Sequence, residues 1–351
     1  MTRTIDRLAA LALAAALALP LLLLALLGAA TLAPARAQDA SSCEGRSLIE
    51  GLKADGRYAA VAAEAARVPN GRGKFFRIER AGLAPSHLFG TIHLTDPRVL
   101  ALPPGAEAAF AEASRLVIET TDIMDQKKAA AAFFADPALT ALPAGRRLGD
   151  LVSADQRALL EEALARKGIP FQSIETLQPW FVSVAVSVPP CEAARKAEGL
   201  GVLDLTLAER ASAAGKPVEG LESAAEQLQA LASLPLDLQV ESLVAGVENA
   251  DRMPDLMETM VELWRAGEIG TIMPALEKAL PAGAAMLGTA EGASAFEKAI
   301  LTDRNARMAE RMQAALSAGG AFVAVGALHL PGPDGLVEML RARGWTVSRA
   351  D

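Results

Sequence analysis

The sequence predicts a mixed α/β domain, in which a central mixed β-sheet is flanked by helices and interrupted by a large helical insertion. Short β-rich runs lie near residue 75 and near the C-terminus, and the long segment between them has the periodicity of amphipathic helices. With 351 residues, 52% apolar and 22% charged, the chain can bury a sizeable core. Because no low-complexity linker follows residue 72, residues 73–351 are expected to form one domain.

The N-terminus has the features of an export signal. Arg3 and Arg7 flank a long apolar run (residues 8–32), which is followed by Ala-Arg-Ala. These small residues predict cleavage after Ala37, so residues 1–37 are expected to be a signal peptide. Because the apolar run is longer than the usual ~7–15 residues, an uncleaved membrane anchor is the alternative. The protein is therefore expected in the periplasm or outside the cell, and at the membrane only if that segment stays attached.

The charge pattern argues against nucleic acid as a partner. The net charge is −8, and removal of the signal peptide, with its three Arg and one Asp, leaves −10. Lys and Arg form no cluster in the sequence, so neither nucleic acid nor an anionic membrane surface is expected to bind. A peptide or a small molecule is the expected substrate class.

The two cysteines, Cys43 and Cys191, both lie in the exported part of the chain. In an oxidising compartment such a pair predicts one disulfide, which would close a loop of about 150 residues. Two free buried thiols are the alternative. The disulfide would tie an N-terminal arm, residues 38–72, to the middle of the chain. This arm is polar at first and then Ala-rich, and it is expected to be helical.

The first strands are expected after the break at "VPNGRGK". The runs "FFRIER" (residues 75–80) and "HLFGTI" (87–92) are separated by a turn-like segment, which predicts a hairpin. A loop and an alanine-rich helix follow His93. The run "RLVIETT" (115–121) then predicts a third strand, which carries Glu119 at its end.

Residues 125–317 are predicted to be mostly helical. The segment "SADQRALLEEALARKG" starts with a capping box at Ser153 and Gln156 and stops at a glycine. The amphipathic segment 201–215 is followed by "KPVEGLES" (216–223), which predicts a short strand within the helical block. The chain closes with a strand, a helix and a strand, in "AFVAVGALHL", "PDGLVEMLRARG" and "WTVSRAD".

Two stretches share the frame Gly-x-x-His at the end of an apolar run. They contain Gly90 with His93 and Gly326 with His329, and the chain has three histidines in all. Glycine at this place lets a backbone or a ligand approach closely. Each histidine alone is more often a hydrogen-bonded core residue than a ligand, but the repeated frame favours a shared site. The third histidine, His87, is interpreted as a partly exposed strand residue.

If the strands from the two ends of the domain pair in one sheet, four polar side chains meet at strand C-terminal ends. They are His93, Glu119, Glu222 and His329. Two imidazoles and one or two carboxylates can hold a divalent metal with an open position for water. Without metal they can supply a base, an acid and an orienting partner. Glu222 has a second interpretation, as the first-turn acid of the following helix.

Several motifs, in fixed order, make the chain resemble a known family. They are "GTIH", "VIET", "QPWF", "GVLDLTLAERASAAGKPVEGLES", "DRNARMAERM" and "VAVGALHLPGPDGLVEMLRARGWTV". From about Phe75 to the C-terminus, this set resembles the TraB/GumN family, which includes the animal Tiki ectodomains, and in particular its exported bacterial branch. The resemblance implies a Tiki-like fold, similar in outline to erythromycin esterases and the haem-binding ChaN proteins.

The resemblance also implies a metal-dependent hydrolase, specifically a peptidase. It assigns the metal to His93, Glu119 and His329, with Glu119 as third ligand or general base. Four further residues match polar positions of the family: Arg304, Asn305, Asp204 and Glu222. Mn, Co and Zn are all chemically admissible, since Zn suits two His and a carboxylate whereas a more oxygen-rich set suits Mn.

The pair Arg304 and Asn305 has two interpretations. Arg304 would steady an oxyanion or orient Glu119, whereas the residues alone are also compatible with a solvated helix face. Three alternatives to a metallopeptidase stay open. They are a metal-free esterase-type hydrolase with a histidine base, a haem-binding protein, and a non-catalytic envelope protein. For haem, the only tyrosine, Tyr58, lies far from the motifs, so His or Met ligation would be needed.

Overall fold

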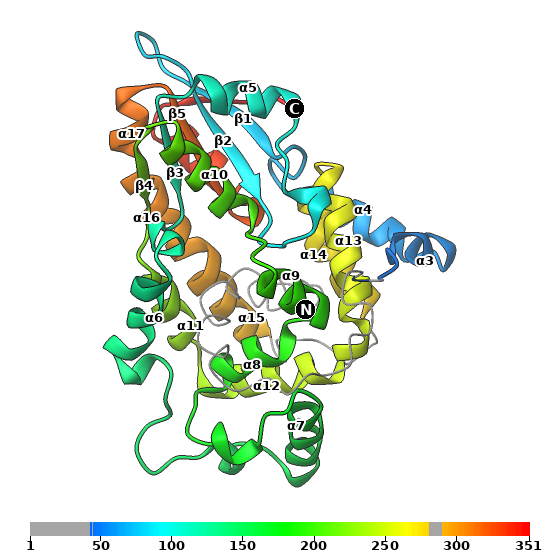
Figure 1. The fold of residues 1–351 in the computed structure, drawn as a ribbon. Helices are drawn as coiled ribbons and strands as arrows, with labels where there is room; N and C mark the ends of the chain where they lie inside the picture. The colour runs from blue at the N-terminus through cyan, green and yellow to red at the C-terminus, as the bar shows by residue number, and fades with distance from the viewer. Residues whose placement is uncertain (1–42, 44, 281–289) are drawn as a thin grey trace.

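The structure, a computed structural model, describes residues 43, 45–280 and 290–351 (Figure 1). The predicted signal peptide and its cleavage site lie outside these residues. In the predicted N-terminal arm, the helices α3 (Ile49–Ala54) and α4 (Tyr58–Ala65) are present. A disulfide between Cys43 and Cys191, with 5.4 Å between their Cα atoms, joins this arm to the middle of the chain, as expected.

A six-stranded mixed sheet forms the upper half of the molecule in Figure 1, in the order β4-β3-β5-β2-β1-β6. β1 and β2 form the predicted antiparallel hairpin, and β6 pairs antiparallel with β1. The strands β4, β3, β5 and β2 run parallel, so their C-terminal ends meet at one edge. The bounds are β1 (Phe75–Glu79), β2 (Ser86–Thr91), β3 (Arg115–Ile118), β4 (Val218–Gly220), β5 (Ala321–Gly326) and β6 (Thr346–Arg349).

Helices fill the long connections between β3 and β4 and between β4 and β5, which confirms a helical insertion with a short strand inside it. The helix α5 (Pro104–Glu112) joins β2 to β3, and between β3 and β4 lie α6 (Gln126–Ala135), α7 (Ala154–Arg166), α8 (Pro179–Ser187), α9 (Pro190–Ala197) and α10 (Leu203–Ala213). After β4 come α11 (Ala224–Ala232), α12 (Leu236–Glu248), α13 (Met253–Arg265), α14 (Ile269–Ala279), α15 (Ala290–Glu297), α16 (Asp303–Arg311), α17 (Gln313–Ala318) and, beyond β5, α18 (Leu336–Ala342).

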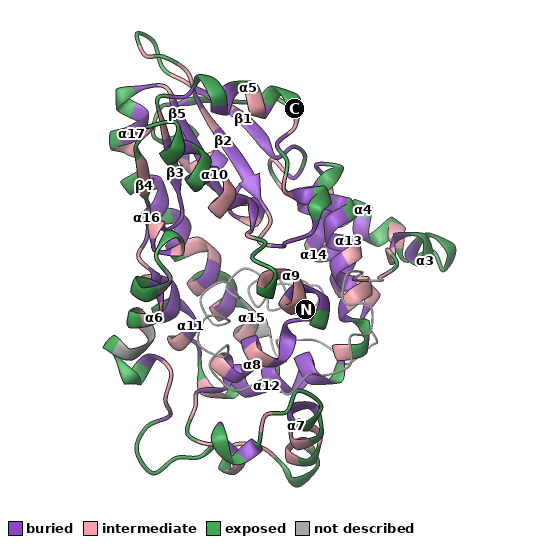
Figure 2. Cartoon of the chain, viewed as in Figure 1, coloured by how far each residue is buried: buried purple, intermediate pink, exposed green. Residues whose placement is uncertain are grey.

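Two hydrophobic clusters cover the two faces of the sheet, and the central strands β3, β5 and β2 between them are mostly buried (Figure 2). Because side chains alternate along a strand, Phe89 and Phe322 face the cluster that includes α5, α10, α13 and α14. Their neighbours Leu88 and Val323 face α16, α17 and α18. A third cluster packs α7, α8 and α12 together away from the sheet. The arrangement confirms the predicted α/β class; that residues 73–351 act as one domain stays a prediction.

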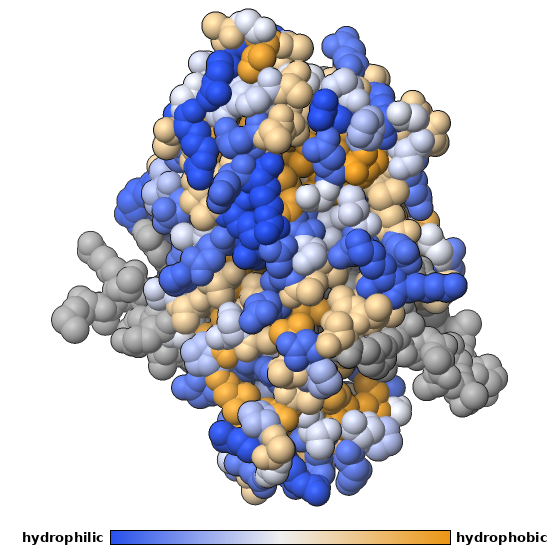
Figure 3. Space-filling view, turned by 90° about the vertical axis from the view of Figure 1, so that its left-hand side faces the viewer, coloured by the Kyte–Doolittle hydropathy of each residue, from blue (hydrophilic) through white to orange (hydrophobic). Residues whose placement is uncertain are grey.

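The surface carries few large apolar side chains. Among the described residues, those that are exposed are Met124 and Leu200, each 40% exposed. Seen from the side of α6, α11 and α16, hydrophilic side chains form a large continuous group in the upper half of the molecule (Figure 3). Within the described residues no single helix has the length and apolar composition to cross a membrane, and α11 with α12 meets that test only as a pair bent by 95°.

Candidate active site

The parallel strand ends bring together the side chains that the sequence singled out. His93 follows β2 and Glu119 directly follows β3, while His329 ends the short helix η9 (Ala327–His329) after β5. Since β5 lies between β2 and β3, the three side chains meet at one edge of the sheet. The sequence analysis named the pairing of first and last strands as the condition for this meeting, and the structure fulfils it.

The carboxylate of Glu119 lies between the two imidazoles. Its Oε1 atom is 3.7 Å from Nε2 of His93 and 3.7 Å from Nε2 of His329. The three side chains are nearly buried, with 10% of His93, 6% of His329 and 7% of Glu119 exposed. Two nitrogen donors and one oxygen donor therefore surround the same small space.

His93 is oriented through its second ring nitrogen. Nδ1 of His93 donates to Oδ2 of Asp204 over 3.1 Å, and the other oxygen of Asp204 accepts the hydroxyl of Thr91 over 2.9 Å. Thr91 is the last residue of β2, so the strand itself positions Asp204. In the neutral form of the ring, Nδ1 carries the proton and Nε2 presents a lone pair toward Glu119.

His329 is oriented in the same way by an amide. Its Nδ1 lies 2.6 Å from Oδ1 of Asn305, and the Asn305 amide nitrogen donates to the carbonyl of Asp334 over 2.8 Å. Because the amide nitrogen is engaged there, the oxygen faces the histidine, and Nδ1 must donate. Nε2 of His329 then also presents its lone pair to Glu119.

Glu119 is held at both oxygens. Oε1 accepts the backbone N–H of Gly326 over 2.7 Å, and Oε2 accepts from Gln227 over 3.1 Å and from Arg304 over 2.8 Å. Arg304 also donates to Glu222 through Nε and Nη2, at 2.9 and 2.7 Å. Of the two roles considered for Arg304, the geometry favours orientation of Glu119.

Two sequence-based interpretations are wrong. Arg304 and Asn305 do not form a solvated helix face, since each is 3% exposed; α16 turns this side inward. Glu222 is not a first-turn acid of α11, because it precedes the N-cap residue Ser223 and its buried carboxylate pairs with Arg304 and Arg307. In both cases a polar side chain on an amphipathic element faces a buried polar partner that the local pattern does not reveal.

The sequence analysis missed Gln227 and Thr91. Gln227 is 5% exposed and contacts Glu119 from the first turns of α11. The sequence did contain a signal for Gln227, namely the capping box of Ser223 and Glu226. This motif marks where α11 starts and therefore which residues lie on its buried face. Thr91 had no comparable signal, since a threonine at a strand end is common.

The surroundings shift the pKa values of these groups in opposite directions. Burial lowers the pKa of His93, but the carboxylates of Asp204 and Glu119 outweigh it and raise that pKa to about 10. Burial and the Arg304 guanidinium lower the pKa of His329 to about 3. Burial alone raises the pKa of Glu119, yet Arg304 and the two histidines hold it well below its usual value. Without metal the site thus combines a carboxylate with one charged and one neutral imidazole.

The donor set fits a divalent ion in its chemistry. Two imidazole nitrogens and a carboxylate oxygen are ligands of Zn²⁺ and related ions, and both rings have their distal nitrogen held by an oxygen, as metal-binding histidines do. The 3.7 Å separations exceed the roughly 3.4 Å between ligands of one tetrahedral ion. Accordingly, among the described residues no group of three His, Cys, Asp or Glu is already close enough to hold a metal. Binding requires a small inward movement of these side chains.

The two glycines of the shared frame are expected to respond differently to alanine. A Cβ at Gly90 would lie 2.9 Å from Cα of Ala327, so Gly90→Ala is expected to cost roughly 1–3 kcal/mol of stability.

A Cβ at Gly326 would lie 3.1 Å from Oε1 of Glu119 and 3.5 Å from Nε2 of His93. Gly326→Ala is therefore expected to keep most of the stability and to weaken divalent-ion binding. Chemical denaturation and metal titration check both, and the reverse pattern would contradict this assignment.

A buried glutamate between two oriented histidines, at the carboxyl edge of a mostly parallel sheet, defines an α/β protein with an enzyme-like polar site. The chain belongs to the TraB/PrgY/gumN family, whose model matches residues 75–349. The resemblance seen in the sequence motifs is thereby confirmed.

Three relatives illustrate this membership. Metalloprotease TIKI1 of Homo sapiens is 26% identical over 314 residues, 76% of this chain and 60% of that protein. Metalloprotease TIKI2 of Xenopus tropicalis is 28% identical over 308 residues, 75% of this chain and 57% of that protein. The uncharacterized protein YbaP of Escherichia coli (strain K12) is 26% identical over 263 residues, 73% of this chain and 87% of that protein. The chain thus spans about 60% of the length of the Tiki relatives. No solved structure matches it.

Proposed function

We propose that this protein is an exported, metal-dependent hydrolase that cleaves peptide bonds. The observation that carries the proposal is the placement of Nε2 of His93 and of His329 around Oε1 of Glu119. The names of the Tiki relatives, which are metalloproteases, support the reaction type. The disulfide supports export, because disulfides persist in oxidising compartments.

In this proposal His93, His329 and Glu119 hold the ion. When bound there, a divalent ion lowers the pKa of a water molecule and polarises the carbonyl of the substrate. Asp204 and Asn305 keep the two rings turned with Nε2 inward. Since ligands must be unprotonated, His93 gives up its extra proton when the site is loaded.

The remaining residues fix the negative charge at the centre of the site. Arg304 and Gln227 occupy Oε2 of Glu119, which leaves Oε1 facing the histidines. In the alternative role of Glu119, as general base and not as ligand, Oε1 would be the oxygen that accepts a proton from the attacking water. Glu222 accepts from Nε and Nη2 of Arg304, and Nη2 also donates to Glu119, so the two carboxylates hold the guanidinium together.

Removal of metal is expected to abolish hydrolysis. We expect protein treated with a chelator to lose cleavage of an unstructured peptide, and addition of Zn²⁺, Mn²⁺ or Co²⁺ to restore it. Glu119→Gln is expected to lower activity by at least about 100-fold with every metal, because it removes the charge that the ion requires. Cleavage assays paired with metal analysis check this. Full activity in excess chelator would assign a metal-free mechanism instead, and no cleavage under any condition would contradict a hydrolase.

A further inference from the structure

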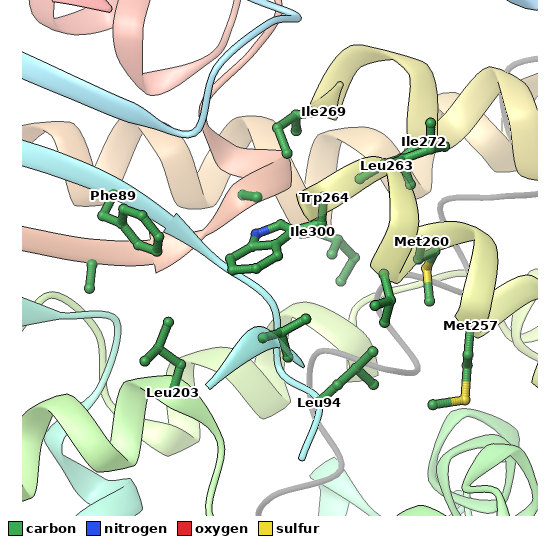
Figure 4. Packing of buried hydrophobic residues seen from close by; sticks show 14 of the residues in the cluster. Phe89, Leu94, Leu203, Met257, Met260, Leu263, Trp264, Ile269, Ile272 and Ile300 are labelled. Atoms are coloured by element: carbon green, nitrogen blue, oxygen red, sulfur yellow. The ribbon is translucent and has the colours of Figure 1, made fainter. Parts of the chain in front are cut away.

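A cavity opens directly beside the polar site, and most of its wall is apolar. One end is formed by His93, Glu119, Arg304 and His329. Helical segments of the insertion supply much of the rest, with Met260 and Trp264 on α13, Ile272 on α14, Phe296 on α15 and Ile300 just after it. Residues that follow β2 and β5, such as Leu94 and Leu328, complete the lining. Figure 4 shows Met260, Trp264, Ile272 and Ile300 grouped in this region. The reacting end and the apolar end therefore belong to one space.

The size of the cavity suits a single amino-acid side chain. Its volume is about 70 Å³. Since one water-sized group needs roughly 10–15 Å³ of such space, the cavity holds about five to seven heavy atoms. A phenylalanine side chain fills such a space, and the smaller leucine and methionine side chains fit within it. A charged side chain of the same length would leave its charge without a partner among Met260, Ile272 and Phe296, which is costly.

The apolar wall is held in place before any ligand arrives. The indole N–H of Trp264 donates to the carbonyl of Gly90 over 2.9 Å, and the ring packs edge-on against Phe89. The ammonium group of Lys74 binds the carbonyls of Trp264 and Arg265 at the end of α13 and lies 4.6 Å from the indole centroid. Trp264 is thereby fixed to β2, the strand that His93 follows, so cavity and site keep their relative positions.

The wall also contains a π-helical turn, η8 (Lys298–Thr302), between α15 and α16. Such turns are rare and are frequently found at functional sites. Here Ile300 and Leu301 line the cavity and Arg304, one turn later, reaches Glu119. The distorted turn is therefore placed where one continuous helical segment supplies both the apolar wall and the charged anchor.

A second cavity adjoins the first. Leu301 and Leu328 line both cavities, and the second has a volume of about 210 Å³. That second cavity is bordered by α4, α14 and the turn after His329, and it includes the charged side chains of Glu64 and Arg67. The two cavities therefore adjoin at Leu301 and Leu328, so further space lies next to the one beside the polar site.

From these observations we propose that the cavity selects a bulky, uncharged side chain next to the bond that is cleaved. The inference rests on the proposed function for the cleavage itself, but the selectivity of the cavity can be measured separately. The substrate class is a peptide with leucine, methionine or phenylalanine at that position.

The test uses one peptide series in which a single position beside the cleaved bond is Ala, Leu, Phe, Asp or Lys. The metal-loaded wild type is expected to favour Leu and Phe over Ala by at least about tenfold in kcat/KM, and to cleave the Asp and Lys peptides least. Met260→Ala, which enlarges the cavity, is expected to shift the preference toward Phe by at least about tenfold. Equal rates across the series would overturn the proposal.

Met257→Ala is the matched control. Met257 lies one turn before Met260 on α13 and is equally buried, at 3% exposed, but it does not line the cavity. It is expected to lose similar stability and to keep the wild-type preference. A shift of preference in Met257→Ala as large as in Met260→Ala would show that the effect is structural and would contradict the assignment.

Binding provides the readout that separates this inference from the proposed function. Calorimetric titration with N-acetyl-leucinamide, N-acetyl-phenylalaninamide and N-acetyl-alaninamide is expected to show binding of the first two only, weakened by filling the cavity in Ile272→Trp. Selective binding without any peptide cleavage would uphold the cavity and contradict the hydrolase. Cleavage without side-chain selectivity would uphold the hydrolase and contradict the selectivity of the cavity.

Discussion

Arg304→Met is expected to lower the free energy of unfolding by about 3–5 kcal/mol. Arg304 is 3% exposed and pairs with two buried carboxylates, Glu119 and Glu222, at 2.8 and 2.7 Å. Methionine fills a similar volume but leaves both carboxylates without this partner in a buried place, where an unpaired charge is expensive. Urea denaturation followed by circular dichroism measures the loss.

Arg307→Met is the control for this prediction. Arg307 donates to the same Glu222 carboxylate over 2.8 Å, but its side chain is 31% exposed. Solvent screens such a pair, so this variant is expected to lose no more than about 1 kcal/mol. The triple variant Arg304→Met, Glu119→Gln, Glu222→Gln is expected to recover part of the stability, because the orphaned charges are gone. Equal losses in the two arginine variants would show that Arg304 is not the centre of the buried network.

His93→Ala and His329→Ala are each expected to remove the bound metal and to lower hydrolysis by more than about 100-fold. The reason is that the two Nε2 atoms share one carboxylate oxygen of Glu119, so neither ring serves a separate site. Metal analysis of purified protein, together with the peptide assay, checks both variants. If one variant kept stoichiometric metal, the two histidines would not belong to one ion.

Two further variants, His87→Ala and Asp204→Asn, serve as comparisons for the histidine variants. His87 lies on the same strand as Gly90 but stacks on Phe75, with 5.3 Å between ring centroids, and its replacement is expected to leave metal content unchanged. Asp204 touches His93 and orients it, so Asp204→Asn is expected to reduce metal affinity or activity by about 10–100-fold. A loss in His87→Ala as large as in His93→Ala would point to a general effect on the fold.

Local sequence patterns account for most of the structural features that the sequence predicted. The β-rich run "FFRIER" and the capping box at Ser153 depend on neighbours in the sequence, and the strand and the helix form where expected. Strand-end polar residues were also visible, because a carboxylate such as Glu119 after an apolar run demands a partner. These features let His93 and His329 be singled out before their separation was known.

The sequence by itself thus determined the fold class, the strands and the residues at their ends. The tertiary structure decided which partners those residues have. In the folded protein Arg304 is buried, Gly90 packs closely against Ala327, and Gly326 lies beside Glu119. Residues of α13, α14 and α15 line one cavity next to the site. The physical reason is that periodicity and capping act over a few residues. By contrast, the pairing of β5 between β2 and β3, and the burial of helices against that edge, depend on contacts between segments far apart in the chain.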